Sequence, residues 1–193
     1  MTIDALILAG GKSSRMGGRH KGSLLCHGTS LTERLALELG KTAGNVYISY
    51  GQILHRDSSV GIPVQDIYPG CGPMSGLHAG LQASSADLVF TAPCDMPLLT
   101  AGFYEYLMQF ISDPQTDTVV PRRGDRLEPL AAIYRPSCSR IFERQLQTGQ
   151  YRIRMAFDQM HVICPDVSGD PALSGMLVNI NTPEDYERFL GAN

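Results

Sequence analysis

The sequence predicts an α/β fold in which a mostly parallel sheet lies between two layers of helices. Short apolar runs rich in β-branched residues alternate along the chain with segments that have helical spacing and helix caps. One such run, Asp87–Ala92, has the continuous apolar character of a strand inside a sheet. The 193 residues suit one domain of ordinary size and contain no internal repeat, low-complexity tract or linker. We therefore expect residues 1–193 to form a single three-layer α/β/α domain.

Local signals define the elements of the first half of the chain. The apolar run Ile3–Ala9 predicts the first strand, and Ser30-Leu31-Thr32-Glu33 is a capping box that predicts a helix ending near Lys41. The elements expected next are, in order, Asn45–Tyr50 (strand), Ile62–Gln65 (strand), Ser75–Ala83 (helix) and Asp87–Ala92 (strand).

The second half continues the alternation. Thr100 begins a helix, a charged loop over residues 122–126 joins two strands, and Gly149 supplies the C′ residue of a further helix. The last helix begins at Thr182-Pro183-Glu184-Asp185, with Thr at the cap, Pro at the first helical position and an acid at the third. The other expected ranges are Thr118–Val120 (strand), Leu130–Tyr134 (strand), Pro136–Gln147 (helix) and Met176–Ile180 (strand).

Composition and charge exclude several classes of function. A formal net charge of −3 gives no general basic field for nucleic acid, and no apolar run approaches the roughly 20 residues of a membrane span. The N-terminus has no basic segment followed by a long apolar core, so no signal peptide is predicted. The five cysteines are scattered without a C-x-x-C pair. This pattern argues against a disulfide framework or a zinc site and favours the reducing cytoplasm.

A glycine-rich basic stretch, LAGGKSSRMGGRHK from Leu8 to Lys21, follows the first strand directly. Ligands of open parallel α/β sheets bind beyond the carboxyl ends of the strands, which is where this stretch begins. It is not a Walker A motif, because the required earlier glycine would fall at Leu6, and it lacks the G-x-G-x-x-G spacing of a dinucleotide site.

The same stretch has the composition of a loop that binds a triphosphate. Its glycines let backbone N–H groups approach an anion, and its cations supply charge-assisted hydrogen bonds. The cations other than histidine are Lys12, Arg15, Arg19 and Lys21. The alternative is a surface turn whose basic side chains are only solvated.

A carboxylate follows a second strand at the same edge of the sheet. The segment Pro93-Cys94-Asp95-Met96-Pro97 comes directly after Asp87–Ala92, and Asp66 follows the short third strand. A magnesium ion that serves phosphates uses one or two protein carboxylates and keeps several waters. Asp95 fits this need, and Asp66 is a second contact to metal or nucleotide; the alternative for Asp95 is a turn residue before a proline. Together with the basic loop, Asp95 indicates Mg²⁺-dependent attack on a nucleoside triphosphate.

These motifs together resemble the molybdenum cofactor guanylyltransferase family, which joins GMP to the phosphate of molybdopterin. The family's opening signature, close to L-A-G-G-x-S-x-R-M-G-G-x-D-K, is matched from Leu8 to Lys21 at every fixed position except one. Further matches occur in order along the chain, at Asp66, Gly72-Pro73-x-Ser75-Gly76, Pro93-Cys94-Asp95-x-Pro97 and Asn179-x-Asn181-Thr182-Pro183-Glu184. The resemblance implies a Rossmann-like nucleotidyltransferase fold.

The resemblance also implies a role for individual residues. Leu8, Ala9 and Gly10, with the adjacent Gly11, would contact the nucleotide, as would Asp66. Lys21 and Arg15 would bind its phosphates. Asp95 would hold Mg²⁺, and Asn179 and Asn181 would line the pterin side. Catalysis by Arg15, Lys21 and Asp95 would consist of positioning and charge neutralisation. No general base is needed, so none of the five histidines is nominated.

The sequence departs from the family pattern at two positions. His20 stands where the family usually has Asp before the lysine, and Ser49 stands where the second strand usually has Asn. We assign no nucleotide contact to Ser49.

Several alternatives remain open at this stage. A relative could use CTP on the same pterin, although such relatives resemble L-A-A-G where this chain has Leu8-Ala9-Gly10-Gly11. A sugar-phosphate nucleotidyltransferase and a non-catalytic carrier of the finished cofactor are the others. The expected partners are GTP, molybdopterin, and molybdoenzymes or other cofactor-biosynthesis proteins, with no nucleic acid and no membrane. We expect a monomer or weak oligomer. The loop 122–126 either reaches the acceptor phosphate or is a solvated turn.

Overall fold

A seven-stranded sheet forms the centre of the protein in the computed structural model, which describes residues 1–10, 21–51 and 60–192. Its strand order is β11-β7-β10-β6-β1-β4-β5. The pairs of β1 with β4, β1 with β6, β4 with β5 and β7 with β11 are parallel, and only β10 runs antiparallel to its neighbours. The strands are β1 (Ile3–Leu8), β4 (Val46–Ser49), β5 (Ile62–Val64), β6 (Leu88–Pro93), β7 (Thr118–Val119), β10 (Ile133–Tyr134) and β11 (Val162–Ile163).

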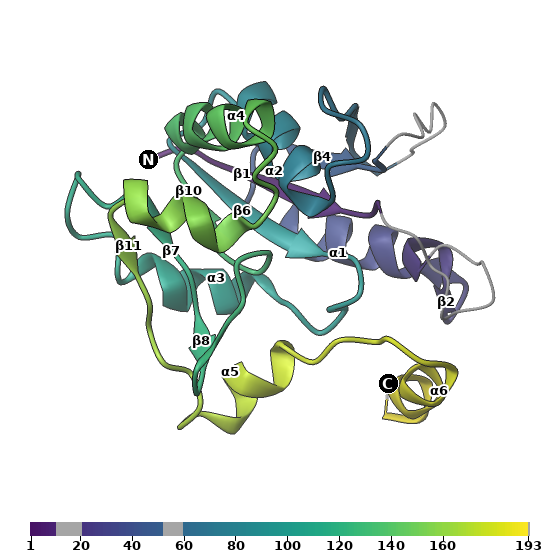
Figure 1. Cartoon of the computed structure of the whole chain (residues 1–193). Coiled ribbons are helices and arrows are strands. Elements are labelled where there is room, and N and C mark those ends of the chain that lie inside the picture. The colour runs from purple at the N-terminus through teal and green to yellow at the C-terminus, as the bar shows by residue number, and fades with distance from the viewer. Residues whose placement is uncertain (11–20, 52–59, 193) are drawn as a thin grey trace.

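Helices cover both faces of this sheet, as predicted (Figure 1). Alternate side chains of β1 point to opposite faces. Ala5 and Ile7 join the core cluster that contains side chains of α1 and α3, whereas Leu6 and Leu8 join the cluster that contains side chains of α2 and α4. The α-helices are α1 (Leu31–Leu39), α2 (Pro73–Ala83), α3 (Ala101–Met108), α4 (Ser139–Gln147), α5 (Pro171–Met176) and α6 (Pro183–Ala192). The three-layer α/β/α prediction is confirmed.

Smaller elements complete the described chain. The two-stranded sheets are β2 (Leu25–Cys26) with β3 (Thr29–Ser30), and β8 (Arg122–Arg123) with β9 (Arg126–Leu127). The short 3₁₀ helices are η2 (Lys21–Ser23), η3 (Pro136–Cys138) and η4 (Ile153–Gln159). No helix within the described ranges has the length and apolar character needed to cross a membrane.

Three predicted helix caps are confirmed. The capping box of α1 is complete, since Glu33 N donates to Ser30 Oγ (3.2 Å) and Ser30 N donates to Glu33 Oε2 (2.8 Å). Gly149 ends the turn after α4 with φ of +76°, a conformation that favours glycine. At α6, Asp185 N donates to Thr182 Oγ1 (3.1 Å) and Thr182 N donates to Asp185 Oδ2 (3.0 Å).

The predicted strand Met176–Ile180 is wrong. Met176 is the last residue of α5, and the residues from Leu177 to Asn181 have no regular secondary structure. Leu177 and Ile180 are buried in two different hydrophobic clusters, which accounts for the apolar pattern without any pairing in the sheet. The strand at the β7 end of the sheet is β11, which pairs in parallel with β7 and was not predicted.

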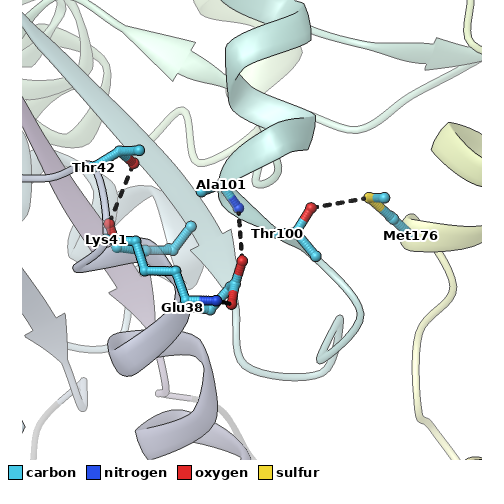
Figure 2. A network of polar contacts seen from close by, with 7 residues as sticks. Glu38, Lys41, Thr42, Thr100, Ala101 and Met176 are labelled. Carbon is cyan, nitrogen blue, oxygen red and sulfur yellow. Dashed lines mark hydrogen bonds and ion pairs between the residues drawn. The ribbon is translucent and has the colours of Figure 1, made fainter.

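A set of polar contacts joins α1, α3 and α5 (Figure 2). Glu38 near the end of α1 reaches the first residue of α3, where its Oε1 accepts a hydrogen bond from Ala101 N (3.2 Å), and its Oε2 pairs with Lys41. Thr100 at the cap of α3 donates to Met176 Sδ at the end of α5 (3.5 Å). An acidic group at a helix N-terminus accepts a hydrogen bond from a free backbone N–H and interacts favourably with the positive end of the helix dipole. Glu38 therefore fixes α3 against α1.

Candidate active site

The ends of β1, β4 and β6 lie together at the carboxyl edge of the sheet. Cys94 N donates to Leu8 O (3.0 Å), and Ala9 N donates to Ser49 O (2.8 Å). These bonds continue the pairing of Leu8 with Pro93 and with Ser49. The structure thus brings the start of the glycine-rich stretch beside the segment that contains Asp95, as the sequence predicts.

The side chains of Leu8 and Ala9 are buried in the core, so the nucleotide contact expected of these two residues would be made by their backbone atoms. Gly10 is exposed, and a Cβ built on it would lie 2.8 Å from Gly51 N and 3.0 Å from Gly51 Cα. Position 10 therefore needs glycine because the chain after β4 passes so close to it. The remainder of the predicted phosphate loop, including Gly11 and Arg15, lies outside the described residues. Lys21 begins η2, but its side chain also lies outside them.

Asp66, which follows β5, is held by Ser49. The Ser49 hydroxyl donates to Asp66 Oδ1 (2.9 Å) and accepts a longer bond from Gly51 N (3.4 Å). Ser49 is 2% exposed, so its hydroxyl makes these hydrogen bonds in the protein interior. Burial raises the pKa of Asp66, and hydrogen bonds from Ser49 and Ser75, with the nearby charge of His78, partly oppose that rise. Ser49 thus orients the side chain of Asp66, which the sequence analysis expects to contact the nucleotide.

A pocket of about 640 Å³ lies at the same edge and includes Asp95 and Asn179. Asp95 O accepts a hydrogen bond from Ile180 N (2.7 Å), which fixes the segment before α6 against the end of β6. The structure therefore places Asp95 and Asn179, two predicted site residues that are 84 positions apart in the sequence, in the same pocket. Asn181 is not among the described residues that line the pocket; its backbone N–H donates to Asp185 Oδ2 (3.0 Å) at the start of α6.

The rest of the pocket wall was not assigned from the sequence. It contains the β9 strand with the residues after it, and the segment that leads into η4. The polar members of this wall are Arg126, Glu128, Tyr151, Arg152 and Arg154, and the apolar ones include Pro73, Pro93, Leu127, Pro129, Leu130, Ile153 and Met155. Among the polar residues of this wall, Arg126 lies in a segment that the sequence analysis singled out, the charged loop 122–126, and this segment forms the β8–β9 hairpin rather than an irregular loop.

Two side chains with potentially reactive groups, those of His78 and Cys94, are buried. His78 is 1% exposed and packs edge-on against Tyr68 with ring centroids 5.4 Å apart. Burial lowers the pKa of His78, which favours its neutral form. Cys94 is also buried.

The family model of the MobA-like NTP transferase domain matches residues 5–163. The chain belongs to this family. The molybdenum cofactor guanylyltransferase of Vibrio vulnificus is 31% identical to it over 185 residues, which cover 95% of this chain and 93% of the relative. The probable molybdenum cofactor guanylyltransferase of Clostridium perfringens is 36% identical over 142 residues, covering 74% of this chain and 70% of the relative. The resemblance drawn from the motifs is confirmed, and the protein is a nucleotidyltransferase.

A solved structure shows the same fold. The crystal structure of molybdopterin-guanine dinucleotide biosynthesis protein A from Archaeoglobus fulgidus superposes with a TM-score of 0.80 at 23% sequence identity, covering 98% of this chain and 97% of that one. The predicted nucleotidyltransferase fold is therefore confirmed over nearly the whole chain.

Proposed function

We propose that the protein transfers GMP from GTP to the terminal phosphate of molybdopterin and releases pyrophosphate, forming the guanine dinucleotide form of the molybdenum cofactor. The observation that supports this function most strongly is the pocket containing Asp95 and Asn179 beside the end of β1. It occurs in a chain that matches a molybdenum cofactor guanylyltransferase along nearly its whole length.

The reaction needs positioning more than covalent chemistry. An oxygen of the acceptor phosphate attacks the α-phosphorus of GTP, the bond from that phosphorus to the bridging oxygen breaks, and pyrophosphate leaves with its electron pair. A phosphate monoester is largely ionised near neutral pH, so the attacking oxygen needs no general base. The buried, neutral His78 is not required. The protein's task is to hold two phosphate groups together and to offset their charge.

The donor set at the pocket fits a magnesium ion. The described part of the chain contains no group of three or more His, Cys, Asp or Glu side chains that could hold a metal by themselves. Mg²⁺ bound to a nucleotide needs only one or two carboxylates and takes its other ligands from phosphates and water. Asp95 would supply the carboxylate, with the amide of Asn179 in the same pocket. The ion would neutralise phosphate charge in the transition state.

The nucleotide would lie over the ends of β1 and β4. Asp66, held by Ser49, is the side chain available there, and Gly10 exposes backbone beside Gly51. We assign the triphosphate to Arg15 and Lys21, since guanidinium and ammonium groups bind phosphate oxygens strongly. The acceptor would occupy the pocket, with Asn179 on the pterin side.

Pyrophosphate release tests this proposal. Protein, GTP, Mg²⁺ and molybdopterin together should release pyrophosphate, and omission of any one should abolish the release. Asp95→Asn should remove activity, whereas Asp113→Asn, on the exposed segment between α3 and β7 and outside the pocket lining, is the matched control and should not. Turnover when CTP replaces GTP, but not with GTP itself, would favour a cytidylyltransferase. Tight binding of the finished cofactor without any turnover would favour a carrier.

A further inference from the structure

One buried carboxylate on the pocket wall is surrounded by arginines. Glu128 is 5% exposed, and Arg126 Nε lies 2.7 Å from its Oε1. Burial raises the pKa of Glu128, while Arg126, Arg123 and Arg154 oppose that rise, so all three cations lie near this carboxylate. Burying an acid costs free energy unless cations and hydrogen bonds compensate it. A buried carboxylate with a raised pKa and cationic neighbours in a pocket is a candidate functional group.

The geometry of the pair leaves most of the arginine available. Arg126 Nε forms an ion pair with Glu128, whose buried Oε1 accepts no hydrogen bond among the described residues, and a guanidinium has four further N–H groups on its two Nη atoms. The Arg126 side chain is 61% exposed and belongs to the pocket lining. None of those four N–H groups has a protein acceptor within the described ranges. Because Arg126 lines the pocket, these N–H groups can donate to an anion bound there.

The pair stands on a rigid support. Arg122 Nη1 of the same hairpin lies 2.8 Å from Asp166 Oδ2, and Gly124 N donates to Ser168 Oγ (2.7 Å). Glu128 N donates to Pro121 O (2.9 Å), which closes the base of the hairpin. Arg126 is thus oriented before any ligand arrives, so little side-chain entropy is lost on binding.

The pair also lies near the proposed reaction centre. Asp95 and Arg126 line the same pocket, and the charge of Asp95 contributes to the raised pKa of Glu128. An anion held by Arg126 would therefore be close to the carboxylate assigned to the metal. The group that must occupy this place in the reaction is the attacking phosphate.

We propose that Arg126 binds the terminal phosphate of the acceptor and that Glu128 is the positioning residue that orients its guanidinium. This inference rests on the proposed function and goes further by assigning the acceptor phosphate to a hairpin that the sequence left open between two interpretations. Arginine suits the role because its fork matches two phosphate oxygens at once, which a lysine ammonium cannot do.

The test is steady-state kinetics with molybdopterin and GTP varied separately. Arg126→Ala should raise the KM for molybdopterin at least about tenfold, the loss expected for one charge-assisted hydrogen bond, and leave the KM for GTP unchanged. Arg126→Lys should recover only part of the loss. Glu128→Gln should raise the same KM, and it should have no further effect when Arg126 is already alanine. Arg140→Ala, an exposed arginine on α4 outside the pocket lining, is the matched control and should behave as wild type.

The two proposals fail separately in this experiment. A wild-type protein that does not join GMP to molybdopterin contradicts the proposed function. An active wild type whose Arg126→Ala variant keeps its KM for molybdopterin contradicts the role of Arg126. An equal rise of the KM values for molybdopterin and GTP in Arg126→Ala contradicts the assignment of Arg126 to the acceptor phosphate. Additive effects of Arg126→Ala and Glu128→Gln contradict the positioning role of Glu128.

Discussion

Removal of the Ser49 hydroxyl should destabilise the protein in a pH-dependent way. Ser49 Oγ donates to Asp66 Oδ1 at 2.9 Å from a buried position, so Ser49→Ala deletes a hydrogen bond to a charged group. Such bonds contribute about 1.5–3 kcal/mol, and the lower end, about 1.5 kcal/mol, applies because Asp66 is only half-buried. For a protein of this size the loss corresponds to a fall in Tm of about 3–6 °C.

The sign of the pH dependence follows from Asp66. Its pKa is raised in the folded state, so the folded protein binds this proton more tightly than the unfolded chain does. Stability therefore falls as the pH rises from the unfolded pKa of about 3.9 through the folded pKa. The bond from Ser49 lowers the folded pKa, and its loss should raise that pKa further. The destabilisation by Ser49→Ala should be small near pH 4 and complete at pH 7.

Urea unfolding at both pH values measures the effect. Each free energy of unfolding for Ser49→Ala is compared with that of wild type, and the comparison is repeated in an Asp66→Asn background. The asparagine has no charge to stabilise, so the difference between the two pH values should vanish there. An equal loss at pH 4 and pH 7 in the Asp66 background would refute the claim that Ser49 acts on the ionised carboxylate.

Three further substitutions separate catalysis from stability. Asp95→Asn should lower kcat by about a hundredfold or more without a change in Tm. Normal turnover of this variant at saturating Mg²⁺ would show that Asp95 is only a turn residue. Gly10→Ala should cost about 1–3 kcal/mol in urea unfolding and weaken GTP binding in titrations, since its Cβ would lie 2.8 Å from Gly51 N; wild-type values would show that the two loops can separate. Glu38→Ala should cost about 1 kcal/mol in thermal unfolding with unchanged kinetics, because Ala101 N loses its acceptor; an unchanged Tm would disprove this capping role.

Local patterns were sufficient for the part of the fold that positions the site. The runs that became β1 and β6 are buried and apolar throughout most of their length, and the caps at Ser30 and Thr182 depend only on residues within one helical turn. Because parallel strands share a carboxyl edge, these local signals also predicted that Asp95 and the glycine-rich stretch would be neighbours. The positions of Leu8, Gly10 and Asp95 followed from the same rule.

The remainder depended on contacts that no local pattern records. Leu177 and Ile180 have the spacing of a short strand, but they are buried by packing in two separate clusters. Glu128 is a single acid before a proline in the sequence, and only the hairpin geometry makes it a buried partner of Arg126. The same holds for Ser49, whose bond to Asp66 spans 17 residues and two strands.

The base choice of the enzyme tests the central claim most directly. Equal concentrations of GTP and CTP are offered to the wild-type protein with molybdopterin and Mg²⁺, and the dinucleotide products are separated and identified by mass. The account predicts the guanine dinucleotide as the main product, with GTP preferred at least about tenfold in kcat/KM, which is roughly 1.4 kcal/mol in transition-state free energy. A predominance of the cytosine dinucleotide, or the absence of any transfer, would contradict it.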